Sequence, residues 1–130
     1  MNITDNQKEQ ISQVARKNDV KSIILFGSQV KGHTHPQSDI DIAVLSNNKP
    51  NYTLYSTLYE GFSNILGDRV DVRFLNDADP QFGMQVLSSG VLLYGDPTYF
   101  NLLKTQFNRR YIDDGKKYFP YLHQLATSWV

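Results

Sequence analysis

Apolar residues are spaced along the chain in two ways that predict different secondary structures. Compact apolar runs at 22–26 and 39–45, and an alternation of apolar and charged residues at 69–75, predict three β-strands. Apolar residues at helical spacing predict a helix from Thr4 to about Asn18 and another at 52–66. Residues 80–94 predict a further helix that ends at Gly90 and leads into a short strand.

Local signals at the helix ends support these boundaries. Thr4 with Gln7 forms a capping-box pattern, and Gly67 can close the helix at 52–66. An Asp-Pro pair at 79–80 supplies a cap and a first-turn proline, and the pair at 96–97 repeats this before a C-terminal helix. The order of elements predicts an α/β (α+β) fold, in which helices pack on one side of a small mixed sheet and the other face is left for chemistry.

Length and composition narrow the class of protein. A chain of 130 residues can bury one core, which we place at 1–96, with a helical segment at 97–130 that packs on it and is suited to partner binding. Thirteen basic residues balance thirteen acidic ones, so stable nucleic-acid binding is not expected. The absence of cysteine excludes disulfides and thiolate metal sites. No segment resembles a signal peptide or a membrane span, so we expect a cytoplasmic protein without a membrane partner.

The most specific feature of the sequence is a Gly-Ser turn at 27–28, placed ten residues before the pair Asp39-x-Asp41. Alternate residues of a strand point to one face, so the two carboxylates lie on the same face with Cα atoms roughly 6–7 Å apart. Like charges at this spacing repel unless a cation lies between them, and Mg²⁺ prefers carboxylate and phosphate oxygens. We therefore predict that Asp39 and Asp41 converge on two Mg²⁺ ions.

Residues around the turn have the properties of a phosphate site. Gly27 allows a phosphate to approach the backbone closely, and Ser28 offers a hydroxyl and an N–H as donors. A helix predicted to begin near Gln29 directs its N-terminal amides at the same anion, and Lys31 adds a positive charge. We also count Ser38 among the nucleotide-binding candidates.

The Gly-Ser turn followed by Asp-x-Asp resembles the signature of the DNA polymerase β-like nucleotidyltransferase superfamily. This resemblance implies that the two aspartates bind the metals that activate a nucleoside triphosphate, and that a third carboxylate lies on a neighbouring strand. Asp71, in the alternating segment at 69–75, is the candidate for this catalytic and metal-binding carboxylate. Arg73 shares its strand face, where it either contacts a phosphate of the nucleotide or pairs with Asp71.

Over nearly its whole length the chain is similar to the minimal nucleotidyltransferases (MNT), which include antitoxins paired with HEPN ribonuclease toxins. The resemblance implies a polymerase β-like nucleotidyltransferase core at 1–96 and an antitoxin of a type VII-like HEPN/MNT pair. It further implies Mg²⁺-dependent transfer of AMP from ATP to a hydroxyl of the HEPN toxin, with tyrosine as the expected acceptor. The toxin would be both substrate and partner, in a hetero-oligomeric complex.

The C-terminal segment leaves two interpretations open. Phe100 and Leu103 are expected to pack on the core, whereas the distal part, interrupted at 113–115 and at Pro120, is rich in aromatic and basic residues and suits either self-packing or partner binding. Two other functions also compete with AMP transfer to a toxin. One is a nucleotidyltransferase for a small molecule such as an aminoglycoside, and the other is an antitoxin that acts by occlusion and tolerates loss of the carboxylates.

Overall fold

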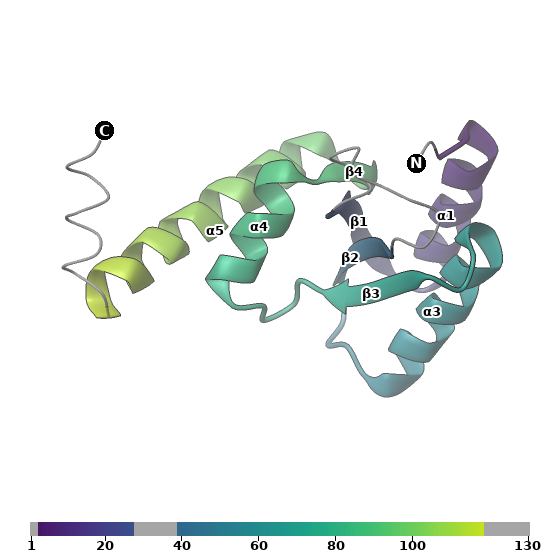
Figure 1. Cartoon of the computed structure of the whole chain (residues 1–130), viewed down its shortest axis with the longest axis horizontal. Coiled ribbons are helices and arrows are strands. Elements are labelled where there is room, and N and C mark those ends of the chain that lie inside the picture. Colours follow the sequence, from purple (N-terminus) through teal and green to yellow (C-terminus); the bar gives the residue numbers. More distant parts are fainter. Residues whose placement is uncertain (1–2, 28–38, 119–130) are drawn as a thin grey trace.

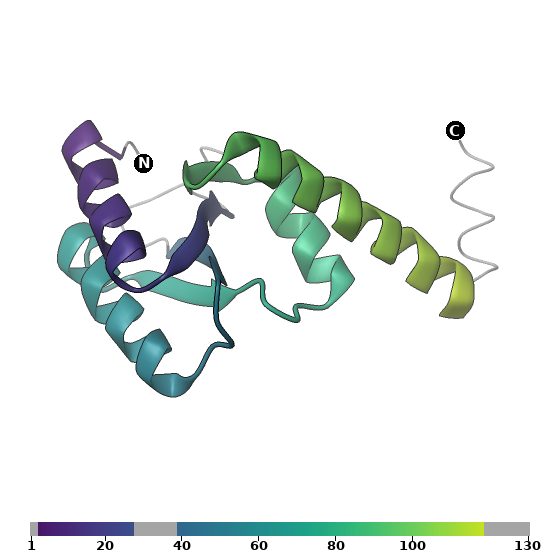
Figure 2. The ribbon, with the colours of Figure 1, turned by 180° about the vertical axis from the view of Figure 1, so that it is seen from behind.

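The protein folds into a four-stranded sheet with helices on both sides, as the ribbon in Figure 1 and the reverse view in Figure 2 show. A computed structural model describes residues 3–27 and 39–118, the last five of them by backbone alone. The described elements are α1 (Asp5–Lys17), β1 (Val20–Phe26), β2 (Ile40–Ser46), α3 (Tyr52–Leu66), β3 (Val70–Phe74), α4 (Pro80–Ser89), β4 (Val91–Tyr94) and α5 (Pro97–Tyr118).

The helix boundaries follow the capping signals in the sequence. The Thr4 hydroxyl accepts the backbone N–H of Gln7 at 3.1 Å, and the Gln7 side chain accepts that of Thr4 at 3.0 Å, which completes the capping box. Helix α3 ends at Gly67, whose φ of 103° is open to glycine and unfavourable for other residues. Asp79 caps α4 by accepting the N–H of Gln81 at 3.0 Å. These predicted boundaries are confirmed.

The sheet is mixed, in the order β3-β2-β1-β4. Strand β1 runs antiparallel to both of its neighbours, β2 and β4, whereas β2 and β3 are parallel. The parallel pair is joined through α3, and this crossover brings the start of β3 beside the start of β2. The predicted small mixed sheet is therefore confirmed, and its topology places the acidic ends of two strands next to each other.

Helices cover both faces of the sheet, so the expectation that they lie on one side only is wrong. Helices α1 and α3 pack on one face through residues such as Ile11 and Phe62, while α4 and α5 pack on the other through Val86 and Phe100 (Figure 1). The physical reason lies in β1, where six of seven residues are buried. A strand whose side chains are apolar on both faces has to be covered on both.

Helix α5 continues for 22 residues, so the predicted interruption at 113–115 is also wrong. A single glycine inside a helix costs only about 1 kcal/mol, which the rest of the helix can tolerate. The prediction that Phe100 and Leu103 pack on the core is confirmed, since both are buried. In the part of the chain that the structure describes, no helix is both long and apolar enough to cross a membrane. Pro120 lies outside the described residues.

Candidate active site

The first residues of β2 and β3 bring two carboxylates together. In this parallel pair Asp41 is the register partner of Asp71, and the flanking pairs Ile40–Val70 and Ile42–Val72 point into the core under α1 and α3. Because strand side chains alternate, burial of these apolar pairs directs both aspartates to the opposite face. Asp39 lies just before β2 and is exposed. The topology therefore unites carboxylates that are 30 residues apart in the chain.

Gly27 sits directly against this acidic group at the end of β1. Its φ is 81°, and a Cβ at this position would collide with Oδ2 of Asp41. The preceding residue, Phe26, is the register partner of Asp41 across the antiparallel β1–β2 pair. Only glycine meets both the backbone angle and the close approach, so the turn after β1 can lie beside the carboxylate.

The electrostatics of the site favour a cation. Burial raises the pKa of Asp41 above its ordinary value, and the negative charges of Asp71 and Asp39 raise it further, while Arg73 opposes the shift. A raised pKa means that the ionised carboxylate is less stable here than in water. Additional positive charge brought by a ligand would stabilise the ionised carboxylate of Asp41.

Arg73 holds Asp71 in place. Its Nε donates to Oδ2 of Asp71 at 3.2 Å, and its guanidinium carbon lies 5.6 Å from the ring centroid of Phe82. Phe82, from the first turn of α4, in turn packs edge-on against Phe26 at 5.8 Å. Of the two roles considered for Arg73, pairing with Asp71 is the contact present here. The sequence alone does not single out Phe82, because the Asp79 cap indicates where α4 begins and not which strand residues α4 contacts.

The remaining candidates cannot be placed. Ser28, Lys31 and Ser38, together with the short helix predicted near Gln29, lie outside the described residues. The described site therefore consists of Gly27, the three aspartates and Arg73, so it contains two of the five predicted nucleotide-binding residues and all three predicted carboxylates.

The donor set suits Mg²⁺ bound together with a nucleotide. Among the described residues, no three His, Cys, Asp or Glu side chains are grouped closely enough to hold one metal ion. Asp41 and Asp71 nevertheless offer oxygen ligands on adjacent strands. Burial, together with the repulsion from Asp71 and Asp39, raises the pKa of Asp41, and a bound cation would stabilise its ionised form. Mg²⁺ usually takes one or two protein carboxylates and completes its shell with phosphates and water.

A mixed sheet with carboxylates on adjacent strands and a glycine turn beside them defines a nucleotidyltransferase-like protein. A family model described as "Polymerase beta, Nucleotidyltransferase" matches residues 9–98, and the chain belongs to this family. The match includes Gly27, Asp39, Asp41 and Asp71.

Individual relatives are similar over different lengths. A protein of Methanocaldococcus jannaschii, provisionally named a protein adenylyltransferase, is 47% identical over 55 residues, which are 41% of this chain and 55% of the relative. The chain thus spans about half the length of this curated relative.

Two solved structures match nearly the whole chain. One chain of a toxin–antitoxin crystal structure with AMP-PNP is 26% identical with a TM-score of 0.77, covering 92% of this protein and 98% of that chain. A chain from a complex of a tri-AMPylated Shewanella oneidensis HEPN toxin with MNT antitoxin is 23% identical with a TM-score of 0.72, covering 93% and 97%. The second likeness concerns the fold alone.

Proposed function

We propose that this protein is the antitoxin of a HEPN/MNT pair and transfers AMP from ATP to a tyrosine hydroxyl of the toxin. The observation that carries the proposal is the pairing of Asp41 with Asp71 beside Gly27, in a chain of the nucleotidyltransferase family. The similarity to a chain of a toxin–antitoxin complex with AMP-PNP supports ATP as the substrate and a toxin as the partner.

In the proposed mechanism the predicted site residues bind the metal, the phosphates and the acceptor proton. Asp39 and Asp41, with Asp71, would hold Mg²⁺, which when bound neutralises phosphate charge and orients the triphosphate. Gly27 and Ser28 bind the β- and γ-phosphates through backbone N–H groups and the serine hydroxyl. Lys31 and Ser38 extend this phosphate site.

We propose that Asp71 acts as the general base. It accepts the proton of the acceptor hydroxyl as the hydroxyl oxygen bonds to the α-phosphorus and the bond from that phosphorus to the β-phosphate bridging oxygen breaks. Pyrophosphate leaves, and AMP remains on the acceptor. Arg73, which donates to Oδ2 of Asp71, orients the carboxylate and leaves the other oxygen available to the substrate.

The proposal is tested by mass spectrometry of the product of the neighbouring gene, which the proposal expects to be the toxin. Incubation of the two proteins with Mg²⁺ and ATP should add about 329 Da per AMP to the toxin. The double variant Asp39→Asn with Asp41→Asn should give no adduct and no protection of cells. Asp5→Asn with Glu60→Gln, which removes two exposed carboxylates on α1 and α3, serves as the matched control and should behave as the wild type.

Two results would contradict the proposal in different ways. If the wild type adds no AMP to the toxin, transfer to this partner is wrong. If the double aspartate variant gives no adduct but still protects cells fully, the protein acts by occlusion and not by catalysis.

A further inference from the structure

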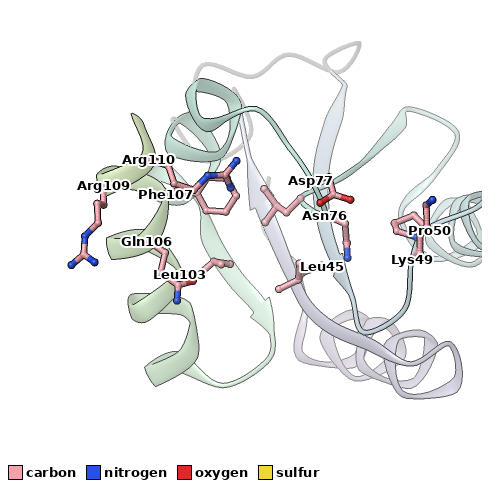
Figure 3. A pocket seen from close by; sticks show the side chains of 11 residues that line it. Leu45, Lys49, Pro50, Asn76, Asp77, Leu103, Gln106, Phe107, Arg109 and Arg110 are labelled. Atoms are coloured by element: carbon pink, nitrogen blue, oxygen red, sulfur yellow. The ribbon is translucent and has the colours of Figure 1, made fainter. Parts of the chain in front are cut away.

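A groove separates α5 from the loops that follow β2 and β3 (Figure 3). Its volume is about 730 Å³, within the range of sites that bind ligands or inserted side chains. The floor is apolar and the rim is polar. We call it the α5 groove; the residues used below are Leu45, Leu75, Leu103 and Phe107 of the floor and Lys49, Asp77, Arg109 and Arg110 of the rim.

The floor of the α5 groove is fixed by the core of the protein. Leu75, Leu103 and Phe107 are each at most 6% exposed, so their positions are set by packing. Phe107 lies directly on Gly83 of α4, where any side chain would collide with its ring. The guanidinium of Arg110 lies 5.1 Å from the centroid of the same ring. The groove is thus a preformed apolar surface with a cation held at its edge.

The charge of the rim differs from that of the whole chain. Lys49, Arg109 and Arg110 provide three positive charges and Asp77 one negative charge, an excess of two, whereas the complete sequence has a net charge of zero. Basic groups around an apolar floor favour an occupant that combines carboxylates with apolar side chains.

The surface continues along α5 beyond the groove. After Phe107, residues 108–113 are all exposed, and Tyr111 and Ile112 keep 48% and 37% of their surface accessible. Figures 1 and 2 both show this part of α5 extending past α4 and away from the sheet. Because helices in proteins gain most of their stability from packing of an apolar face, an exposed half of α5 with apolar side chains favours a partner protein.

The groove opens on the same side of the sheet as the carboxylates. Leu45 follows Asp41 by four residues on β2, so both point to one face, roughly 13 Å apart at about 3.3 Å per residue. A protein segment seated in the groove would therefore lie on the catalytic side, with the rest of the partner close enough to present a hydroxyl.

We propose that the α5 groove and the exposed part of α5 bind an acidic, amphipathic segment of the protein substrate and hold it at the active site. This inference rests on the proposed function for the identity of the partner. The contacts that would recognise the segment are Arg109, Arg110 and Lys49 for its carboxylates, and Leu45 and Phe107 for its apolar side chains.

The test compares binding of the neighbouring toxin to two charge-matched variants. In Arg109→Glu with Arg110→Glu, the dissociation constant measured by calorimetry without nucleotide should rise at least about 10-fold, because attraction becomes repulsion. The KM for ATP should stay unchanged. Lys8→Glu with Lys17→Glu changes the same charge on exposed positions of α1, on the other side of the sheet, and should bind as the wild type.

A milder variant separates recognition from folding. Arg109→Gln with Arg110→Gln should weaken binding by less than the charge reversal does, and thermal unfolding should show that both variants remain folded. Toxin affinity that is unchanged in the folded charge-reversal variant would overturn the proposal. Because binding is measured without ATP, this result is distinct from a failure of AMP transfer.

Two other occupants are tested with the same variants. If a labelled single-stranded 20-nucleotide RNA bound the wild type and not the charge-reversal variant, while toxin affinity stayed constant, the groove would be a nucleic-acid site. If sedimentation showed a wild-type dimer that the variant lost, with constant toxin affinity, the occupant would be a second copy of this chain. Either result would overturn the proposal.

Discussion

On the face of the sheet covered by α1 and α3, Ile11, Leu58 and Phe62 have no exposed surface, whereas the opposite face leaves Asp39 and Arg73 exposed beside half-buried Asp41 and Asp71. The same strands build both faces. The first face consists of apolar packing and contributes stability. The second is apolar only beneath α4 and α5, and it is polar where β2 and β3 begin.

The comparison shows that in this small fold one face of the sheet contributes mainly to stability, and the other carries the candidate active site. On the face that carries the carboxylates, partial burial and the close approach of like charges make ionised Asp41 unfavourable, as its raised pKa indicates. The face packed by α1 and α3 contains no such conflict among the described residues of its core. Substitutions on the face that carries the carboxylates should therefore mainly change the rate of AMP transfer. Substitutions on the face covered by α1 and α3 should mainly change stability.

The largest expected effect is on the rate of transfer. Asp71→Asn should slow transfer of AMP by roughly 10²–10⁴-fold, the range for loss of a general base, and should leave ATP binding largely intact. Single-turnover kinetics and calorimetry measure the two quantities. Asp68→Asn, an exposed change just before β3, is the control. An unchanged rate would show that the third carboxylate has been assigned wrongly, and weakened ATP binding would show that Asp71 acts mainly as a metal ligand.

The next largest effect is a loss of stability caused by a substitution on the face covered by α1 and α3. Phe62→Ala removes a ring with no exposed surface and should lower the free energy of unfolding by about 3–5 kcal/mol. Tyr52→Ala, at a position 80% exposed on the same helix, should change it by less than about 0.5 kcal/mol. Urea unfolding measures both. Equal effects of the two substitutions would mean that α3 does not pack on the sheet through Phe62.

Much of the fold could be predicted because its signals are local. The capping box of Thr4 and Gln7, the Asp79 cap and the glycine at position 67 each act within one turn of chain, so they can be read without knowing the neighbours. The pairing of Asp41 with Asp71 was anticipated only through the family resemblance, because strand order depends on contacts far apart in the sequence.

Other features depend on such contacts and were missed. The run at 22–26 is apolar at consecutive positions, which is typical of a strand buried on both faces and already indicates that helices cover the sheet on both sides. Phe107 contacts Gly83 because α5 crosses α4. Phe82 lies against Arg73 because α4 packs on the sheet. No sequence pattern within a single helix specifies such contacts between elements.

The smallest expected effect is a gain in stability, whereas most substitutions lower stability. Burial and the charges of Asp71 and Asp39 raise the pKa of Asp41, so the folded state loses stability as Asp41 ionises. This penalty is fully present above the raised pKa and disappears as the pH falls below the ordinary value of 3.8. Because solvent screens a partly exposed group, we expect Asp41→Asn to raise the unfolding temperature at neutral pH by only about 1–2 °C with chelator present.

The measurement is thermal unfolding of both proteins with chelator and then with Mg²⁺ and ATP. A ligand that binds only the folded state stabilises it, so Mg²⁺ and ATP should raise the unfolding temperature of the wild type more than that of Asp41→Asn and reverse their order. Asp5→Asn provides a control in which an exposed carboxylate is lost without repulsion from Asp39 or Asp71. A variant less stable than the wild type in chelator at neutral pH would show that Asp41 contributes to folding, and the contrast between the two faces would then not hold at this residue.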